Sequence, residues 1–247
     1  MDWIEAQRLG EQLRDELDSF GIGCSETRSE RMVRHLDLVI EKNKVMNLTR
    51  ITDPRDGVTL HIVDSLLPLA VDGCGLEAGG RFLDIGTGAG FPGIPYGVMT
   101  GAQGVLLDSV GKKVRAVEGF LGELGLDGQL VGWHGRVEEP PHEYLHSFDR
   151  VLVRAVAPTN VLIEYASPLL RQHGLLIVEK GVPQDDEIAT AKRAAVVCGM
   201  EPLSLREFGL PRGLGHREIL VYEKIRHPQV RLPRAVGEAK RNPLGVV

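Results

Sequence analysis

The residues whose types and spacing could do chemistry are three alternate glycines, Gly86, Gly88 and Gly90, and an aspartate, Asp108. The glycines directly follow a short, mostly apolar run, residues 82–85. Glycines let a backbone turn sharply and let a ligand approach the main chain closely. Asp108 ends the next apolar run, 22 residues after Gly86, where a carboxylate can bind the hydroxyl groups of a ribose. This pattern predicts a ligand site between two neighbouring strands.

The spacing of the glycines favours one kind of ligand over another. A dinucleotide site has the pattern G-x-G-x-x-G, but Phe91 stands where the third glycine would be. The pattern D-x-G-x-G-x-G, which begins at Asp84, resembles the first motif of S-adenosylmethionine methyltransferases with a Rossmann-like fold. A nucleotide site and a turn without a ligand remain the alternatives.

Charged side chains also follow the other predicted strands. Lys112, Lys113 and Arg115 lie in the first turn of the helix after Asp108. They could be ordinary solvated charges, but cations at a helix N-terminus oppose the helix dipole, which favours a phosphate partner. Arg154 ends the fourth predicted strand, where it could face the site or form a structural ion pair.

Two other kinds of catalytic site are excluded. His61, Asp64 and Ser65 could suggest a hydrolytic triad, but they lie on one predicted helix and the chain has no G-x-S-x-G motif. No histidine or cysteine cluster has the spacing of zinc ligands. We therefore expect neither hydrolysis nor a metal.

The periodicity of apolar residues predicts a helical cap followed by an α/β domain. Helices are predicted at about 2–20, 29–43 and 54–69 in the cap, and at 93–99, 111–125, 159–170 and 184–199 beyond it. The predicted strands are 81–85, 104–108, 129–133, 148–153, 174–179, 202–207 and 217–223. The alternation predicts a mainly parallel sheet. Only a Gly/Pro loop joins the last two strands, so we expect that pair to be antiparallel.

Composition and charge indicate a globular protein. The 247 residues are 43% hydrophobic with a net charge of −5, which argues against a non-specific nucleic-acid binder. Residues 226–247 hold five Lys or Arg and one Glu, and this basic tail could contact phosphates or be a solvated end. No apolar run approaches the roughly 20 residues of a membrane helix. The N-terminus does not read as a signal peptide and the three cysteines are scattered, which predicts a cytoplasmic protein.

Together these residues resemble the bacterial family of small-subunit ribosomal RNA methyltransferase G, also called glucose-inhibited division protein B. The set of matching runs is more specific than any single motif. The runs are NKVMNLT (43–49), HIVDSL (61–66), RFLDIGTGAGFPGIP (81–95), LLDSVGKKVR (106–115), GRVEE (135–139), FDRVLVRAVAP (148–158), EKG (179–181) and, more weakly, PRAVGEAKRNPL (233–244). Lys42 and Leu232 depart from the tryptophan and tyrosine that are frequent in the family.

The resemblance implies a class I methyltransferase fold, an α/β architecture with a seven-stranded, mainly parallel sheet, helices on both faces and a helical N-terminal cap. It implies methyl transfer from S-adenosyl-L-methionine to N7 of a guanine in 16S ribosomal RNA. It divides the chain into a cap (1–75), a methyltransferase domain that binds S-adenosylmethionine (76–225) and the basic tail (226–247). Carried over by position, the donor-binding residues are Gly86, Phe91, Val137, Glu138 and Arg154, to which the glycine motif adds Gly88 and Asp108.

The remaining expectations concern the RNA. Arg154, Lys180 and Asn47 are expected to position the donor, the RNA or the guanine, with no general base. The residues expected to touch RNA phosphates are Lys112, Lys113, Arg115, Arg234, Lys240 and Arg241. The partner would be 16S RNA or the small ribosomal subunit, and the chain would act as a monomer. A methyltransferase for a small molecule or protein, and a non-catalytic nucleotide-binding regulator, remain the alternatives.

Overall fold

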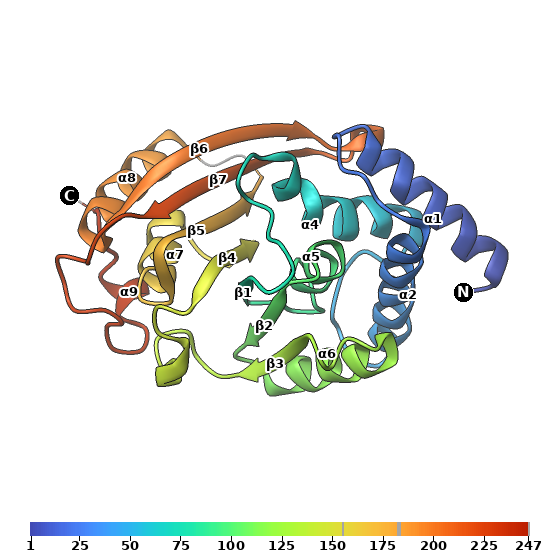
Figure 1. Ribbon diagram of the computed structural model, residues 1–247, viewed down its shortest axis with the longest axis horizontal. Helices are drawn as coiled ribbons and strands as arrows, with labels where there is room; N and C mark the ends of the chain where they lie inside the picture. Colours follow the sequence, from blue (N-terminus) through green and yellow to red (C-terminus); the bar gives the residue numbers. More distant parts are fainter. Residues whose placement is uncertain (155, 182–183, 247) are drawn as a thin grey trace.

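The chain begins with a cap of packed helices (Figure 1). The structure, a computed structural model, describes residues 1–154, 156–181 and 184–246. Helices α1 (Trp3–Asp18) and α2 (Glu26–Asn43) each begin at a side chain that caps the first turn, Asp2 and Ser25 respectively. The two helices pack against each other and against a third helical segment, residues 54–70. The three predicted cap helices are therefore present.

The third cap segment is not one regular α-helix. It consists of α3 (Pro54–Gly57), a widened π turn η1 (Val58–Val63), α4 (Asp64–Leu66) and a tightened turn η2 (Leu67–Ala70). Nearly every residue from 57 to 68 is buried, so the segment lacks the solvent face that a regular amphipathic helix keeps. Widened turns of this kind are frequent at functional sites, and this one carries His61.

The sheet has seven strands in the order β3-β2-β1-β4-β5-β7-β6. Their bounds are β1 (Arg81–Ile85), β2 (Gln103–Asp108), β3 (Leu130–His134), β4 (Phe148–Arg154), β5 (Leu170–Lys180), β6 (Met200–Gly209) and β7 (His216–Lys224). Strands β1 to β5 pair in parallel, whereas β7 is antiparallel to both β5 and β6. The mainly parallel sheet and the antiparallel final pair are both confirmed.

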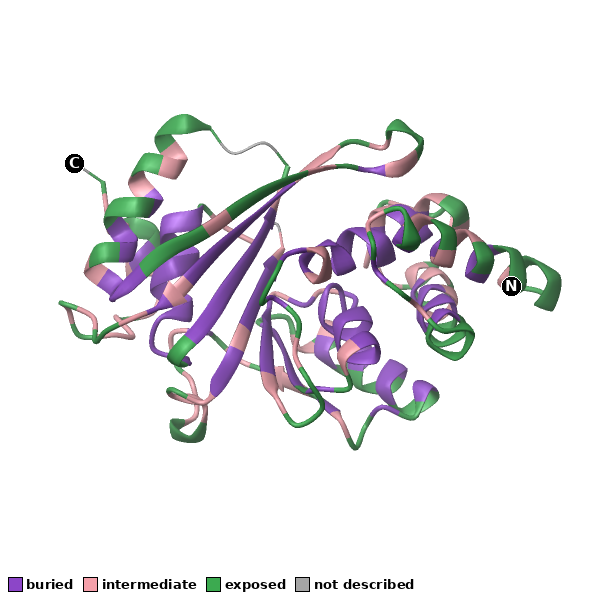
Figure 2. Ribbon diagram, turned by 45° about the horizontal axis from the view of Figure 1, so that its top comes forward, coloured by how far each residue is buried: buried purple, intermediate pink, exposed green. Residues whose placement is uncertain are grey.

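Helices cover both faces of this sheet. Beyond the cap they are α5 (Gly93–Thr100), α6 (Gly111–Leu124), α7 (Thr159–Ala166), α8 (Asp185–Cys198) and α9 (Glu238–Arg241), with short turns η3 (His142–Tyr144) and η4 (Pro211–Gly213). Because alternate strand residues point to opposite faces, Phe82 packs with α5, α6 and the cap, while Leu83 packs with α7 and α8. Figure 2 shows the central strands buried between these layers and much of edge strand β6 exposed.

The cap and the sheet share one apolar core. Leu13, Met32 and Leu36 are fully buried in the same cluster as Phe82 and Ile94. The cap is therefore packed firmly on one face of the sheet rather than tethered to it. The boundaries placed at residues 75 and 225 remain predictions.

One pair of element bounds differs clearly from expectation. Helix α7 ends at Ala166 instead of residue 170, and β5 begins at Leu170 instead of residue 174. Leu170 is buried, but residues 171–173 of β5 are polar and exposed, and His173 has a φ of +63°. That stretch therefore lacks the apolar alternation from which a strand is predicted.

Candidate ligand-binding site

The glycine turn after β1 has the sharp conformation that its sequence predicts. Gly86, Gly88 and Gly90 have φ values of +79°, +60° and +95°, which side chains other than glycine rarely tolerate. The backbone N–H groups of Gly86 and Thr87 donate to the carbonyl oxygen of Leu107 at 2.8 and 2.9 Å, which fixes the turn to the end of β2. A Cβ atom on Gly86 would lie 2.6 Å from Val156, whereas a Cβ on Gly88 would meet no atom closer than 3.9 Å.

Asp108 holds this turn from the neighbouring strand. Its Oδ2 atom accepts from the N–H of Gly88 at 3.1 Å and its Oδ1 atom accepts from the N–H of Val110 at 2.9 Å. The ammonium of Lys113 lies 3.8 Å from Oδ2. Each carboxylate oxygen has more than one lone pair, so both can accept a further hydrogen bond from a ligand.

The turn and Asp108 border a cavity of about 150 Å³, which we call the narrow pocket. Its lining combines the ends of β1 and β2, the loop after β3, helix α7 and the C-terminal tail. The lining residues are Ile85, Gly86, Leu107, Asp108, Ser109, Gly135, Arg136, Val137, Glu138, Val156, Tyr165, Gly237 and Lys240. Four of the predicted donor-binding residues therefore meet here: Gly86, Asp108, Val137 and Glu138.

Glu138 links the narrow pocket to the tail. Its Oε1 atom accepts from the hydroxyl of Tyr165 at 3.3 Å and from the N–H of Gly237 at 3.1 Å. Burial and the charge of Glu138 raise the pKa of Tyr165 to about 12, so the hydroxyl keeps its proton and donates. Lys240, for which an RNA contact is predicted, also lines this pocket.

Phe91 lies behind the glycine turn and lines neither the narrow pocket nor the wide cleft described next. Its ring is enclosed by two histidines, with ring centroids 4.5 Å from His35 and 4.7 Å from His61. Burial lowers the pKa of His35 to about 4 and that of His61 to about 3, so both rings are neutral. His35 bonds the carbonyl of Ala89, and His61 bonds the hydroxyl of Thr49. Phe91 thus anchors the turn to the cap, and its predicted donor contact remains a prediction.

A second, wider cavity opens where β4 and β5 end. This wide cleft has a volume of about 640 Å³. Its lining residues are Leu60, His61, Asp64, Arg154, Val156, Ala157, Glu179, Lys180, Gly181, Glu187 and Arg217. Val156 lines both the wide cleft and the narrow pocket, so the two cavities adjoin at this side chain.

Arg154 extends from the end of β4 into the wide cleft, as its position in the sequence predicts. Its guanidinium donates to the carboxylate of Asp64 at 3.3 Å and to the carbonyl of His61 at 3.4 Å. Arg217 donates to the other oxygen of Asp64 at 2.8 Å. Sequence reasoning missed Arg217, because no local pattern marks a residue of β7 as a neighbour of the cap. Arg154 is both a cleft residue and a partner in an ion pair.

The other two residues predicted to position substrates have different surroundings. Lys180 lines the wide cleft, where its ammonium bonds Glu187, and Glu187 also accepts from the N–H and the hydroxyl of Thr159 at 2.8 and 2.6 Å. Asn47 is exposed in the loop after α2 and lines neither cavity. The structure therefore brings Lys180, but not Asn47, together with Arg154.

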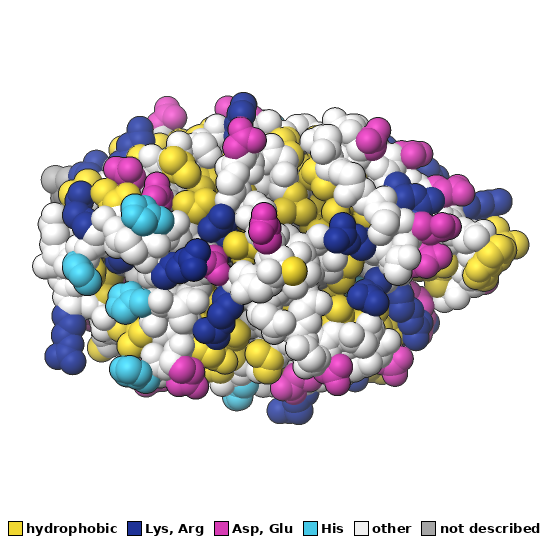
Figure 3. Space-filling model, viewed as in Figure 1, with side chains coloured by type: hydrophobic (Ala, Val, Ile, Leu, Met, Phe, Trp, Pro, Cys, Tyr) yellow, Lys and Arg dark blue, Asp and Glu magenta, His cyan; other side chains and the backbone are white. Residues whose placement is uncertain are grey.

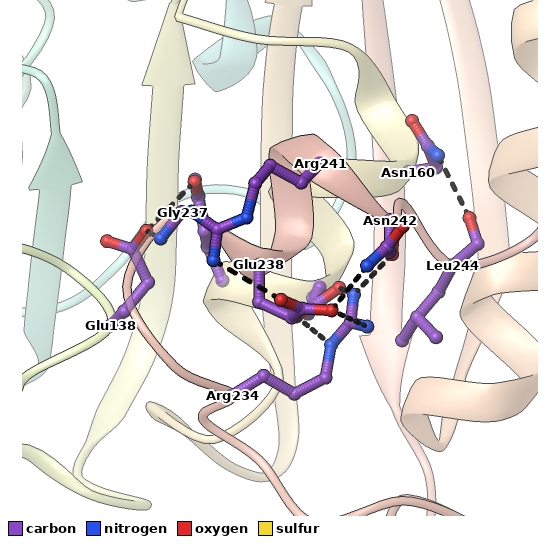
Figure 4. A network of polar contacts seen from close by, with 10 residues as sticks. Glu138, Asn160, Arg234, Gly237, Glu238, Arg241, Asn242 and Leu244 are labelled. Carbon is purple, nitrogen blue, oxygen red and sulfur yellow. Dashed lines mark hydrogen bonds and ion pairs between the residues drawn. The ribbon is translucent and has the colours of Figure 1, made fainter.

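The cations predicted to contact RNA belong to two segments, the start of α6 and the C-terminal tail. Lys112 and Arg115 are exposed on the first turn of α6, next to Lys113. Arg234 forms a two-point ion pair with Glu164 at 2.7 and 2.5 Å, and Arg241 pairs with Glu238 at 3.3 Å (Figure 4). On the face drawn in Figure 3, Lys and Arg side chains are spread out, with acidic side chains between them. The predicted phosphate contacts of these cations remain predictions.

Glu179 is an unpaired carboxyl group in the wide cleft. It is 1% exposed, and neither side-chain oxygen has a hydrogen-bond partner among the described residues. Burial raises the pKa of Glu179 well above its ordinary value, an effect that the charge of Arg154 only partly offsets. A buried polar group without a partner destabilises a fold.

We expect Glu179→Met to raise the free energy of unfolding by about 1–3 kcal/mol at neutral pH, because it removes this penalty. The folded-state pKa is above the unfolded one, so the part of the penalty that comes from ionisation is absent below the ordinary pKa of a glutamate and grows as the pH rises above it. Urea unfolding of both proteins at several pH values from about 4 to 8 measures this difference. A variant less stable than the parent at every pH would show that Glu179 has a partner in solution.

Two classes of feature are absent from the part of the chain that the structure describes. None of its helices combines the length and apolar character needed to cross a membrane. No group of three or more His, Cys, Asp or Glu side chains within residues 1–154, 156–181 and 184–246 is arranged to hold a metal ion.

Comparison with known proteins gives consistent matches over most of the chain. A family model described as rRNA small subunit methyltransferase G matches residues 28–219. The ribosomal RNA small subunit methyltransferase G of Symbiobacterium thermophilum is 38% identical, covering 94% of this chain and 96% of that protein. The protein of the same name from Desulfitobacterium hafniense is 37% identical, covering 96% of each.

A solved structure shows the same fold at low sequence identity. It is geranyl diphosphate C-methyltransferase from Streptomyces coelicolor in complex with Mg²⁺, geranyl diphosphate and S-adenosyl-L-homocysteine. The match has a TM-score of 0.53 and 11% identity, and it covers 66% of this chain and 79% of that one. This likeness concerns the fold alone.

Proposed function

The chain belongs to the rRNA small subunit methyltransferase G family, and from that membership we propose that it transfers a methyl group from S-adenosylmethionine to N7 of a guanine in 16S ribosomal RNA. The observation that carries the proposal is the junction of two cavities at Val156. A narrow pocket beside the glycine turn suits the donor, and the adjoining wide cleft suits the base that receives the methyl group.

The residues of the narrow pocket fit S-adenosylmethionine. A Cβ atom on Gly86 would clash with Val156. Gly88 is not among the lining residues, but it belongs to the same turn and has an open side where a ligand can approach the main chain. Asp108 offers two carboxylate oxygens to ribose hydroxyls. Val137 gives an apolar wall, and Glu138 gives an acceptor within the same pocket. No phosphate group has to be accommodated at the turn, which is consistent with the methyl-donor pattern of glycines.

The chemistry requires positioning rather than proton removal. Bound S-adenosylmethionine supplies an electrophilic methyl group on a sulfonium centre. Guanine N7 carries a lone pair and no proton, so no side chain has to act as a general base. The chain orients the two substrates and excludes water, and proximity then supplies most of the rate. The neutral His35 and His61 agree with this, because their pKa values of about 4 and 3 are unsuited to a base working near pH 7.

We expect the rate of methyl transfer at saturating substrates to be nearly flat between about pH 6.5 and 9, because the reacting lone pair does not titrate there. Single-turnover kinetics on the small subunit measures it. Glu179→Met serves as the control. If the rate of the parent depends on pH, and this dependence disappears in the variant while the maximal rate is kept, the dependence comes from the charge of Glu179 and not from a base. A bell-shaped profile that is abolished by changing His61 or His134 would mean that a base is required.

A label-transfer assay tests the proposed function itself. The protein is incubated with S-adenosylmethionine labelled in its methyl group and with either stripped 16S RNA or assembled small subunits that lack the modification. We expect the label to appear in 16S RNA as 7-methylguanosine after nuclease digestion. Label only in protein or in small molecules would support the alternative methyltransferases. Nucleotide binding without any transfer would support a regulator.

A further inference from the structure

The C-terminal tail is folded onto the sheet domain. Asn160 donates to the carbonyl of Leu244 at 2.9 Å, and Arg193 donates to the carbonyl of Gly245 at 2.6 Å. Ala239 is 1% exposed within the core that α7 and α8 form with the sheet. These contacts extend to the end of the described residues, so the tail is not the solvated end that its composition also allows.

The strongest anchor of the tail is the ion pair of Arg234 with Glu164. Both nitrogens used by Arg234 lie within 2.7 Å of a carboxylate oxygen. The side chain of Glu164 is only 3% exposed, and a carboxylate buried to that extent needs a paired cation. Arg234 also donates a hydrogen bond to the backbone carbonyl oxygen of Asn242. This network, drawn in Figure 4, fixes where the following residues lie.

The anchored segment closes one side of the narrow pocket. Gly237, with a φ of +77°, directs its N–H to Glu138, and Lys240 lines the same pocket as Asp108. Lys240 forms no ion pair with any residue in the described part of the chain, unlike Arg234 and Arg241. With the segment in place the pocket measures about 150 Å³, which is below the roughly 300–1,000 Å³ of ordinary ligand sites.

We propose that residues 234–242 are the outer wall of the methyl-donor pocket and that Lys240 contacts the bound donor. The inference deepens the proposed function and rests on it, because the ligand is S-adenosylmethionine. Lys240 is an exposed residue that lines this wall, and its ammonium can donate hydrogen bonds to the ring nitrogens or ribose oxygens of adenosine, while Asp108 and Glu138 offer acceptors in the same pocket. Because the pocket is small, the segment shifts outward when the donor enters and then packs against it.

Isothermal titration calorimetry with S-adenosylmethionine and S-adenosylhomocysteine measures how much residues 234–242 contribute to donor binding. Lys240→Met should weaken binding of both by roughly ten- to 150-fold, the scale of one charge-assisted hydrogen bond. Arg234 does not line the pocket, and Arg234→Met should weaken binding several-fold by releasing the anchor. Arg231→Met is the matched control, since Arg231 is an exposed tail cation outside the pocket, and it should bind as the parent does.

Two further measurements distinguish a tail that contacts the methyl donor from a tail that contacts RNA. Hydrogen exchange of residues 234–242 should slow when S-adenosylhomocysteine is added to the parent, and should be fast with or without it in Arg234→Met. Affinity for 16S RNA should change less than two-fold in both variants. Unchanged donor affinity, or a loss of RNA affinity alone, would overturn the inference and make the tail an RNA contact. A parent protein that binds no S-adenosylmethionine would instead contradict the proposed function.

Discussion

Replacement of Asp108 by alanine should weaken S-adenosylmethionine binding by about 1.5–3 kcal/mol, which is roughly ten- to 150-fold in affinity. The loss has two sources. The donor loses an ionised acceptor for its ribose, and the N–H groups of Gly88 and Val110 lose the oxygens that hold the turn. Isothermal titration calorimetry measures the change directly.

Two variants sharpen this prediction. Gly88→Val should cost at least as much, because its side chain would enter the open space beside the turn and its φ of +60° is unfavourable for valine. Asp127→Ala removes an exposed aspartate in the turn before β3 and should bind as the parent does. Unchanged affinity in both site variants, with an unaltered melting temperature, would show that the donor binds elsewhere.

Replacement of Arg154 by methionine should slow methyl transfer by at least about 100-fold, the scale on which positioned charges and orientation act in enzymes. Arg154 is only 16% exposed and lies in the wide cleft close to the junction at Val156. The change should also lower stability by about 1–3 kcal/mol, because it removes one of the two arginines that pair with the buried Asp64 in the described part of the chain and leaves Arg217. Single-turnover rates and urea unfolding separate the two effects.

Arg217→Met is the matched control for the ion pair. Arg217 has the shorter bond to Asp64, 2.8 Å against 3.3 Å, so its loss should destabilise the fold at least as much. Its effect on the rate should be smaller, since it belongs to β7 and not to the strand end beside Val156. If both variants lose the same factor in rate, in proportion to their loss of stability, Arg154 acts only as a partner in the ion pair. That is the alternative that the sequence leaves open.

The parts of the site that could be predicted depend on contacts close in sequence. The turn of Gly86, Gly88 and Gly90 is set by their own backbone freedom. Asp108 is placed opposite it because adjacent parallel strands end at the same edge. The antiparallel final pair follows from a loop too short for a crossover helix. Each of these inferences needed only a local pattern and one rule of sheet topology.

The parts that could not be predicted depend on contacts distant in sequence. His35 bonds the carbonyl of Ala89 from 54 residues away, and Arg217 bonds Asp64 from 153 residues away. The bond between Gly237 and Glu138 spans 99 residues. The spacing and periodicity of residues in the sequence do not indicate which side chains the fold brings together when they are this far apart in the chain. For the same reason the ion pair of Arg234 with Glu164 could not be foreseen from the composition of the tail.

The shared core of cap and sheet limits how this protein can be divided or recombined. The glycine turn rests on Phe91, which is enclosed by His35 of the cap and His61 of the widened turn. An excised sheet domain would expose the surfaces of α5 and α6 that pack against α2, and its turn would lose the two rings that support it. The cap is therefore not an interchangeable module. A chimaera that carries the cap of a relative would need the facing positions of α5, α6 and the turn to be redesigned with it.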